Sequence, residues 1–367
     1  MMRKRLRCAC IAMMMGGFPV LSNAAPDYFS VSPASGRYSA AVALNDAGRY
    51  AVNSFPPEIP YAVASISGSP SSESVGSLGG NVTRIRSLNI LGDAVGDSTT
   101  ATGDVRPFLY SSGRMVDLTA RYDVVNANAI NDRGEIAGRT GDYRAVVLRD
   151  GTVDAFGPDN STASAINGRG DVLVEYFPGG VGYRTAIYSN GSLTDLPLFD
   201  GTPVFGSAIN DAGWVTGYGT TAASQNHAYL YDGDTITDLT PAAVNSIGYD
   251  INNLGQVVGT VDDRAFLYSD GDMIDLNTLV DPQADLLLTS AIEINNRSQI
   301  LARSCDRTGV FCYGAVLLTP VPAIPEPATI AMLLMGLAVL RAHRVHRHTG
   351  RDFSVPTGRG ADFVSGL

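Results

Sequence analysis

The feature that most constrains this chain is a repeat of about 42 residues. Seven segments share a core in which an Ile or Leu is followed by an asparagine and, three positions after the asparagine, by a glycine, which the seventh segment replaces with serine. These residues, called the anchor asparagines below, are Asn45, Asn89, Asn131, Asn167, Asn210, Asn252 and Asn295. They are spaced by 44, 42, 36, 43, 42 and 43 residues. A regular period of this length predicts a repeat architecture in which each copy packs against the next.

Each repeat consists of short segments that are typical of β-strands. After the turn at the anchor asparagine comes a strand such as 256–259, and then an apolar strand such as 228–231. A turn containing glycine follows, as at Asn190-Gly191, and the next strand ends in Asp-Leu. Asn-Gly and Asp-Gly pairs accept positive φ and close tight hairpins. The anchor asparagine is expected to bond nearby backbone N–H groups and so to fix its own turn.

Four short strands in about 42 residues predict one blade of a β-propeller, and seven copies predict a closed ring. The seventh repeat ends after Leu318 without its own glycine turn and Asp-Leu strand, while residues 27–31 precede the first repeat. We therefore expect the N-terminal segment to supply the missing strand. The predicted fold class is all-β, a β-propeller of seven blades over residues 26–320, with a β-solenoid as the alternative.

The N-terminal end predicts export. Four basic residues within positions 3–7 precede an apolar run over residues 8–21, and small residues follow through Ala24 and Ala25. This pattern predicts a signal peptide over residues 1–25 that is cleaved after Ala24 or Ala25. The Sec machinery and signal peptidase are therefore expected partners.

The C-terminal end combines a Pro-Glu-Pro triplet, a short apolar stretch and a basic cluster. The residues that mark it are Pro325, Glu326, Pro327, Arg341, Arg344 and Arg347. Residues 328–340 would form about 20 Å of helix against a hydrocarbon core of about 30 Å. The arginines can snorkel to the headgroups and hold that end in the cytoplasm. We therefore predict a short transmembrane helix over residues 328–340.

These three features resemble the PEP-CTERM sorting signal of exopolysaccharide-producing Gram-negative bacteria, here over residues 321–348. The resemblance implies that an exosortase in the inner membrane recognises and cleaves the segment. It also implies transient anchoring in the inner membrane, followed by delivery to the cell surface or the extracellular space. Residues 349–367 are rich in glycine and show no helical or strand periodicity, so we expect a disordered tail.

The repeats themselves resemble the HAF family of extracellular repeats. The resemblance rests on Ile-Asn-Asp-x-Gly, then His-Ala-Phe/Tyr-Leu-Tyr, then Asp-Leu, and is most complete over residues 209–239. It extends over residues 43–319. It implies an extracellular location and a repeat structure, and it implies no particular chemistry.

The net charge of residues 26–320 indicates which classes of partner the domain can bind. Residues 26–320 contain 17 arginines, no lysine and 33 carboxylates, a net charge of about −16. Such a surface disfavours nucleic acid and anionic polymers and favours cations, Ca²⁺ or neutral glycans. Acidity that only keeps an exported domain in solution is the alternative.

Two cysteines, Cys305 and Cys312, remain after removal of the signal peptide. Six intervening residues suit a short loop between paired strands, and the expected compartment is oxidising, so we predict a disulfide. A metal pair is the alternative, but no histidine or third cysteine stands nearby.

No motif in the sequence specifies a reaction. His227 occupies a repeat position at which other copies carry arginine, so a structural hydrogen-bonding role is expected. There is no Gly-x-Ser-x-Gly, HExxH, P-loop or Rossmann fingerprint. The acidic clusters at 232–238 and 262–275 match no known Ca²⁺ loop, so we predict no metal site and leave a structural Ca²⁺ open. We predict no catalytic residue and no cofactor.

Residues that interrupt the repeat are the candidates for ligand binding. Tyr176, Phe177 and Tyr183 flank a glycine-rich loop, where aromatic rings can stack on a sugar. The predicted function is a non-catalytic binding or structural component of an exopolysaccharide matrix or biofilm. A polysaccharide-active propeller enzyme, a hydrolase or a lyase, is the alternative.

Overall fold

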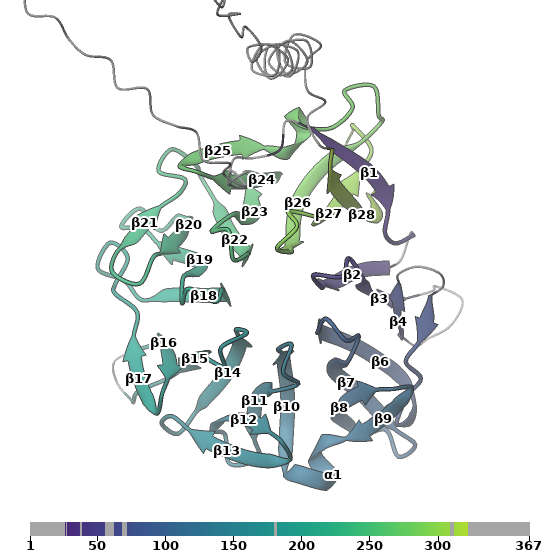
Figure 1. Cartoon of the computed structure of the whole chain (residues 1–367). Coiled ribbons are helices and arrows are strands. Elements are labelled where there is room, and N and C mark those ends of the chain that lie inside the picture. Colours follow the sequence, from purple (N-terminus) through teal and green to yellow (C-terminus); the bar gives the residue numbers. More distant parts are fainter. Residues whose placement is uncertain are drawn as a thin grey trace, which may run out of the picture. The chain divides into compact units, whose positions relative to one another are not determined.

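The computed structural model describes residues 26, 28–36, 39–55, 62–67, 72–179, 182–308 and 312–321. These residues form seven four-stranded sheets arranged around a central axis (Figure 1), which confirms the predicted seven-bladed β-propeller over the solenoid. Within these ranges no helix is long and apolar enough to cross a membrane. The predicted signal peptide, the sorting motif, the transmembrane helix at 328–340 and the tail all lie outside the described residues.

Each blade is an antiparallel sheet whose strands are ordered outward from the axis. The innermost strands are β2 (Ser39–Leu44), β6 (Gly79–Leu88), β10 (Val124–Ile130), β14 (Ser161–Ile166), β18 (Val204–Ile209), β22 (Ser246–Ile251) and β26 (Leu287–Ile294). The second strands are β3 (Tyr50–Ser54), β7 (Ala94–Thr100), β11 (Ile136–Thr140), β15 (Val172–Tyr176), β19 (Val215–Thr220), β23 (Val257–Val261) and β27 (Ile300–Cys305). The third strands are β4 (Val63–Ser67), β8 (Val105–Ser111), β12 (Ala145–Arg149), β16 (Arg184–Ser189), β20 (Asn226–Tyr231), β24 (Arg264–Ser269) and β28 (Cys312–Pro320). The outermost strands are β5 (Glu73–Ser74), β9 (Arg114–Asp117), β13 (Thr152–Phe156), β17 (Ser192–Asp195), β21 (Ile236–Asp238), β25 (Asp272–Asp275) and β1 (Phe29–Pro33).

The seventh blade is completed by the N-terminal strand. β1 pairs antiparallel with β28, from Phe29 opposite Pro320 to Pro33 opposite Val316. Phe29 is fully buried in the hydrophobic cluster between blades six and seven, and its N–H donates to the carbonyl of Leu279 at 2.8 Å. Because one blade contains strands from both ends of the domain, this pairing closes the ring as the sequence predicted.

The hydrophobic core is divided among the seven junctions between neighbouring blades, with one cluster of described residues at each. The leucine of the repeated Asp-Leu pair belongs to this core, and Leu118 and Leu276 are fully buried. The preceding aspartates cap short helices: Asp117 accepts the N–H of Ala120 in α1 (Leu118–Tyr122), and Asp275 caps the 3₁₀ helix η1 (Leu276–Thr278). The sequence showed no helical periodicity here, because a single capped turn is too short to display one.

The anchor asparagines form a closed ring of hydrogen bonds around the axis. In every blade the side-chain Nδ2 donates to the backbone carbonyl of the anchor asparagine in the next blade, at 2.8–3.4 Å. The last of these bonds runs from Asn295 back to Asn45, at 3.0 Å. Each Oδ1 also accepts the backbone N–H four residues further on, at 2.9–3.0 Å. One side chain therefore fixes both the local turn and the contact between blades.

A β-bulge interrupts every innermost strand. The bulged residue is the third before the anchor asparagine, as at Asn128 in β10. A glycine in the second strand permits this geometry in blade three, because a Cβ on Gly138 would lie 1.9 Å from the carbonyl oxygen of Asn126. Bulges re-aim side chains beside functional sites, and this one places Asn126 and Asn128 on the wall of a cavity.

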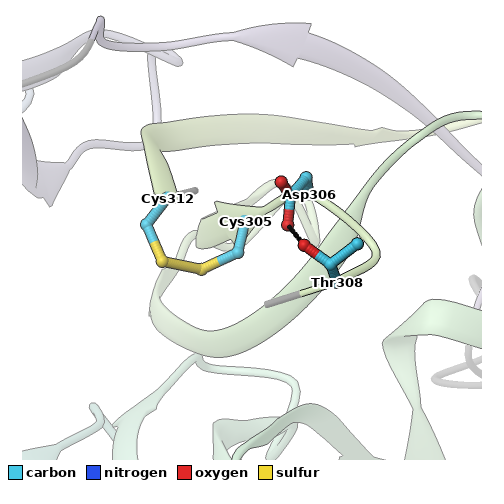
Figure 2. The surroundings of a disulfide bond; sticks show 4 residues. All are labelled: Cys305, Asp306, Thr308 and Cys312. Carbon is cyan, nitrogen blue, oxygen red and sulfur yellow. Dashed lines mark hydrogen bonds between the residues drawn. A yellow bond between two sulfur atoms is a disulfide. The ribbon is translucent and has the colours of Figure 1, made fainter. Parts of the chain in front are cut away.

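The two cysteines lie opposite each other on β27 and β28 and are joined by a disulfide, as Figure 2 shows. Beside it, the Thr308 hydroxyl donates to Asp306 at 2.7 Å. The disulfide thus links the two central strands of the blade that closes the ring.

Candidate functional site

The axial end at which the anchor asparagines lie is structural. Its pocket, of about 190 Å³, is lined by the anchor turns. The aspartates in these turns bond to neighbouring blades: Asp211 accepts the N–H of Gly168 and Asp46 accepts the N–H of Asn296, both at 2.7 Å. The polar groups of this end are therefore used to hold the ring together.

Two further cavities, of about 590 and 480 Å³, lie on the two sides of β2, where Val42 lines the larger cavity and Ala41 the smaller one. We call these two cavities together the funnel. The residues of the funnel used below are Phe55, Arg86, Asn126, Arg139, Glu175 and Arg303. They come from five different blades, so the funnel exists only in the closed ring.

Glu175 lies among polar atoms that have no partner. In the described part of the chain, four buried side-chain atoms make no hydrogen bond: Asn126 Oδ1, Arg139 Nε, Tyr183 Oη and Tyr229 Oη. Asn126 and Arg139 line the same cavity as Glu175, whose carboxylate also acts electrostatically on both tyrosines. Buried polar atoms are rarely left unpaired in folded proteins. All four unpaired atoms belong to residues that line the cavity with Glu175 or interact with its charge, so this wall of the funnel has polar groups available to a ligand.

Burial determines the protonation of this wall. It raises the pKa of Glu175, and the nearby Tyr183 hydroxyl offsets part of that shift without forming an aligned hydrogen bond. Burial, and after it the Glu175 charge, raises the pKa of both Tyr183 and Tyr218. The two tyrosines are therefore neutral hydrogen-bond donors, and Glu175 holds its proton more readily than an exposed glutamate.

Four aromatic rings form a row beside Glu175. Phe177 meets Tyr183 edge to face with ring centroids 5.3 Å apart, Tyr183 stacks on Phe205 at 4.1 Å, and Phe205 stacks on Tyr218 at 4.8 Å. Phe177, at one end of this aromatic row, is 59% exposed. Tyr183, Phe205 and Tyr218 are half-buried, so Phe177 is the most exposed ring of the row.

The structure brings together two of the three residues predicted to bind a ligand. Phe177 and Tyr183 are both in the aromatic row. Tyr176 is not, because alternation along β15 turns it away and its hydroxyl donates to Asp195 at 2.6 Å. Burial, with Asp195 as the second cause, raises the pKa of Tyr176 to about 12.

Sequence reasoning missed Glu175, Arg139, Phe205 and Tyr218. Three of these four occupy the same repeat position, the eighth residue after the anchor asparagine, where Arg303 also stands. When the seven repeats are aligned, this position holds arginine, glutamate and tyrosine, whereas a position needed only for the fold would keep one residue type. This variation is the sequence signal that could have indicated a binding site.

His227 and the acidic clusters have structural roles. His227 is buried, its Nδ1 lies 2.8 Å from Asp238 Oδ2, and its Nε2 lies 3.2 Å from the carbonyl oxygen of Ala243. Asp232 accepts two backbone N–H groups within its own turn, and Asp262 accepts two from the neighbouring loop. Among the described residues, no three His, Cys, Asp or Glu side chains are grouped to hold a metal ion.

Two half-buried acidic residues lie on the innermost strands of blades six and seven. Asp250 and Glu293 each stand two positions before an anchor asparagine, and Asp250 Oδ2 accepts the N–H of Ile294 at 2.8 Å. Burial raises the pKa of Asp250 to about 6. Burial and then the Asp250 charge raise the pKa of Glu293 well above its usual range. Ionisation of the pair therefore weakens the closed ring.

This acidic pair makes stability fall as the pH rises. The folded pKa of Asp250 lies above its ordinary value of 3.8, so its favourable contribution is complete below about pH 4 and is lost as the pH rises through about 6. We expect Asp250→Asn to raise the free energy of unfolding by about 2–3 kcal/mol more at pH 8 than at pH 4. Urea unfolding at the two pH values measures this difference. The same effect at both pH values would show that the pKa of Asp250 is the same in the folded and unfolded states.

Comparison with known proteins shows the fold. No protein-family model matches the chain, and no curated protein matches it. Its structure is similar to that of the Pyrococcus horikoshii acylaminoacyl peptidase, with a TM-score of 0.51 and 11% identity over 76% of this chain and 50% of the peptidase. It is also similar to YCF48 bound to D1 peptide, with a TM-score of 0.51 and 10% identity over 85% of this chain and 100% of YCF48. The chain spans about half the length of the peptidase, and at these identities the two similarities show a propeller fold alone.

Proposed function

We propose that this protein is an exported, non-catalytic glycan-binding component of an exopolysaccharide matrix, and that its ligand binds in the funnel. The observation that carries the proposal is the group of unpaired polar atoms around Glu175, next to the aromatic row. Arg139 Nε and Tyr183 Oη are donors, whereas Asn126 Oδ1 is an acceptor. A sugar hydroxyl both donates and accepts, so a polyhydroxylated ligand matches this mixed set.

The aromatic row supports the same ligand class. Protein sites for sugars combine apolar ring surface with a few well-placed polar groups, and Phe177 offers an exposed ring within 5.3 Å of Tyr183. A flat apolar ring beside hydroxyl-matching polar atoms fits the two kinds of surface on a pyranose. The proposed ligand therefore contacts both Phe177 and the wall formed by Asn126, Arg139 and Glu175.

Binding is favoured over cleavage by the number of carboxylates in the funnel. Most glycosidases use two carboxylates about 5–10 Å apart across the scissile bond. Among the described residues that line the two cavities, Glu175 is the one carboxylate. A second acidic residue for the usual mechanism is therefore not supplied by the cavity walls that the structure describes.

The cellular part of the proposal rests on the two ends of the chain. The predicted signal peptide and the PEP-CTERM-like segment support export by the Sec machinery and sorting by an exosortase. Transient anchoring in the inner membrane and a final location at the surface or in the matrix follow from the same resemblance. Ligand and location agree, because the bacteria in which such signals occur make exopolysaccharide.

Two identical substitutions test the proposed site. Tyr183→Phe and Tyr229→Phe each remove one unpaired hydroxyl, but Tyr183 belongs to the aromatic row beside Glu175 whereas Tyr229 is fully buried in the core. We expect Tyr183→Phe to weaken binding of exopolysaccharide from the source organism about 5- to 10-fold, the value of one hydrogen bond. Affinity electrophoresis measures the change.

The control, Tyr229→Phe, is expected to bind like the unmodified protein and to be at least as stable, because it removes a buried polar group that has no partner. Full binding by Tyr183→Phe, or equal losses in the two variants, would contradict the assignment of the site.

A further inference from the structure

The funnel has the opposite charge balance from the protein as a whole. Residues 26–320 carry a net charge of about −16, yet the two cavities are lined by Arg86, Arg139 and Arg303 against the single carboxylate of Glu175. A fourth arginine, Arg84, lies with its guanidinium 5.8 Å from the ring centroid of Phe55, which lines the smaller cavity. Arginines are thus concentrated where a ligand would enter.

Three of these arginines have no carboxylate partner. Arg86 is neutralised by Asp97, but Arg84, Arg139 and Arg303 form no ion pair with any carboxylate in the described ranges. Other described arginines, such as Arg114, Arg144 and Arg297, also form no ion pair, so this lack does not by itself distinguish the funnel. What distinguishes the funnel is that its cavity walls carry three arginines against one carboxylate.

Arg139 is the best placed of them to bind an anion directly. Its guanidinium lies 4.9 Å from the ring centroid of Tyr143, and its buried Nε has no partner. The same funnel contains an example of what such an edge binds: Arg86 holds Asp97 Oδ2 through Nε and Nη2, at 2.9 and 2.7 Å. A planar guanidinium edge matches a planar carboxylate.

We propose that the funnel selects glycans that carry carboxylate groups, such as chains containing uronic acids, and that Arg139 binds the carboxylate while Arg84 and Arg303 attract it. This proposal rests on the proposed function and names its ligand class. It revises the expectation, drawn from net charge, that neutral glycans are the better partners. Each uronate residue supplies hydroxyls for the unpaired polar atoms and a carboxylate for the arginine.

The acidic surface elsewhere does not cancel this attraction. At physiological ionic strength, charges in solvent that are more than about 8 Å apart are largely screened. A carboxylate in the funnel is close to the arginines that line the cavity walls. Local charge therefore decides binding, and the whole-protein charge mainly affects the approach of a long polymer at low salt.

The test compares one polymer in two forms, polygalacturonate and the same polymer after reduction of its carboxyl groups. We expect the purified protein to bind the carboxylated form at least about 10-fold more tightly than the reduced form, the value of one charge-assisted hydrogen bond. Arg139→Gln is expected to remove that difference, and Arg139→Lys to retain part of it. Arg297→Gln, an equal charge change at the exposed turn of blade seven, serves as the matched control and is expected to leave it intact.

The outcomes separate this inference from the proposed function. Tighter binding of polygalacturonate that Arg139→Gln abolishes, and that Arg297→Gln preserves, supports the inference. Equal binding of the two forms, or equal losses in the two glutamine variants, overturns it while leaving glycan binding in place. Binding of a sulfated but not a carboxylated glycan overturns the carboxylate assignment. Failure to bind any of these polymers or the organism's own exopolysaccharide overturns both proposals.

Discussion

Replacement of Phe29 with alanine is expected to destabilise the whole ring by about 3–5 kcal/mol. Phe29 is fully buried in the cluster between blades six and seven, although it belongs to the first strand of the chain. Its loss leaves a cavity in the strand that closes the propeller, so the effect reaches beyond one blade. Equilibrium urea unfolding followed by far-UV circular dichroism gives the free energy.

The neighbouring residue provides a matched control. Tyr28 is 40% exposed, and its interaction with Val321 is through the backbone, so Tyr28→Ala is expected to cost less than about 1 kcal/mol. If both variants lowered the free energy of unfolding by a similarly small amount, β1 would not be needed to close the ring. The pairing of β1 with β28 would then not stabilise the fold.

Replacement of one anchor asparagine with aspartate is also expected to lower the stability of the ring strongly. In Asn295→Asp the two bonds donated by Nδ2, to the carbonyl of Asn45 at 3.0 Å and to Gln299 Oε1 at 2.9 Å, are lost. A buried negative charge then faces two acceptors. The Oδ1 that shapes the turn is kept, so the change is confined to the contact between blades one and seven. We expect a loss of about 2–4 kcal/mol at pH 7.

The loss should shrink at pH 4, where a protonated aspartic acid can again donate one hydrogen bond. Asn190→Asp is the matched control, because Asn190 lies on an exposed hairpin turn with positive φ that aspartate also accepts. Thermal unfolding at the two pH values distinguishes them. If Asn295→Asp were as harmless as Asn190→Asp at both, the ring of asparagines would be a consequence of the fold and not a cause of it.

The fold was predictable because its determinants are local. The anchor asparagines, the glycines three residues later and the Asp-Leu pairs each fix a turn or a strand end within a few residues of themselves. Their number and period gave the blade count, and the incomplete seventh repeat gave the closure by β1. What the sequence could not give is the ring of bonds between blades, since Asn295 and Asn45 are brought together only by closure.

The candidate site was only partly predictable, for the same physical reason. Phe177 and Tyr183 flank a loop that interrupts the repeat, and they were found on that ground. Arg139, Glu175 and Arg303 stand on different blades at one repeat position, so an alignment of the repeats links them but a motif within one blade does not. The net charge also led to a different expected ligand class, because a sum over the chain does not show that the walls of the two cavities carry three arginines and one carboxylate.

The most direct test of this account is calorimetric titration of the purified protein with exopolysaccharide from the source organism, followed by an assay for new reducing ends. We predict saturable heat that Tyr183→Phe reduces, with no increase in reducing ends. New chain ends would show that the propeller is a polysaccharide-cleaving enzyme. The absence of heat would show that the funnel does not bind this glycan, and either result would contradict the proposed function.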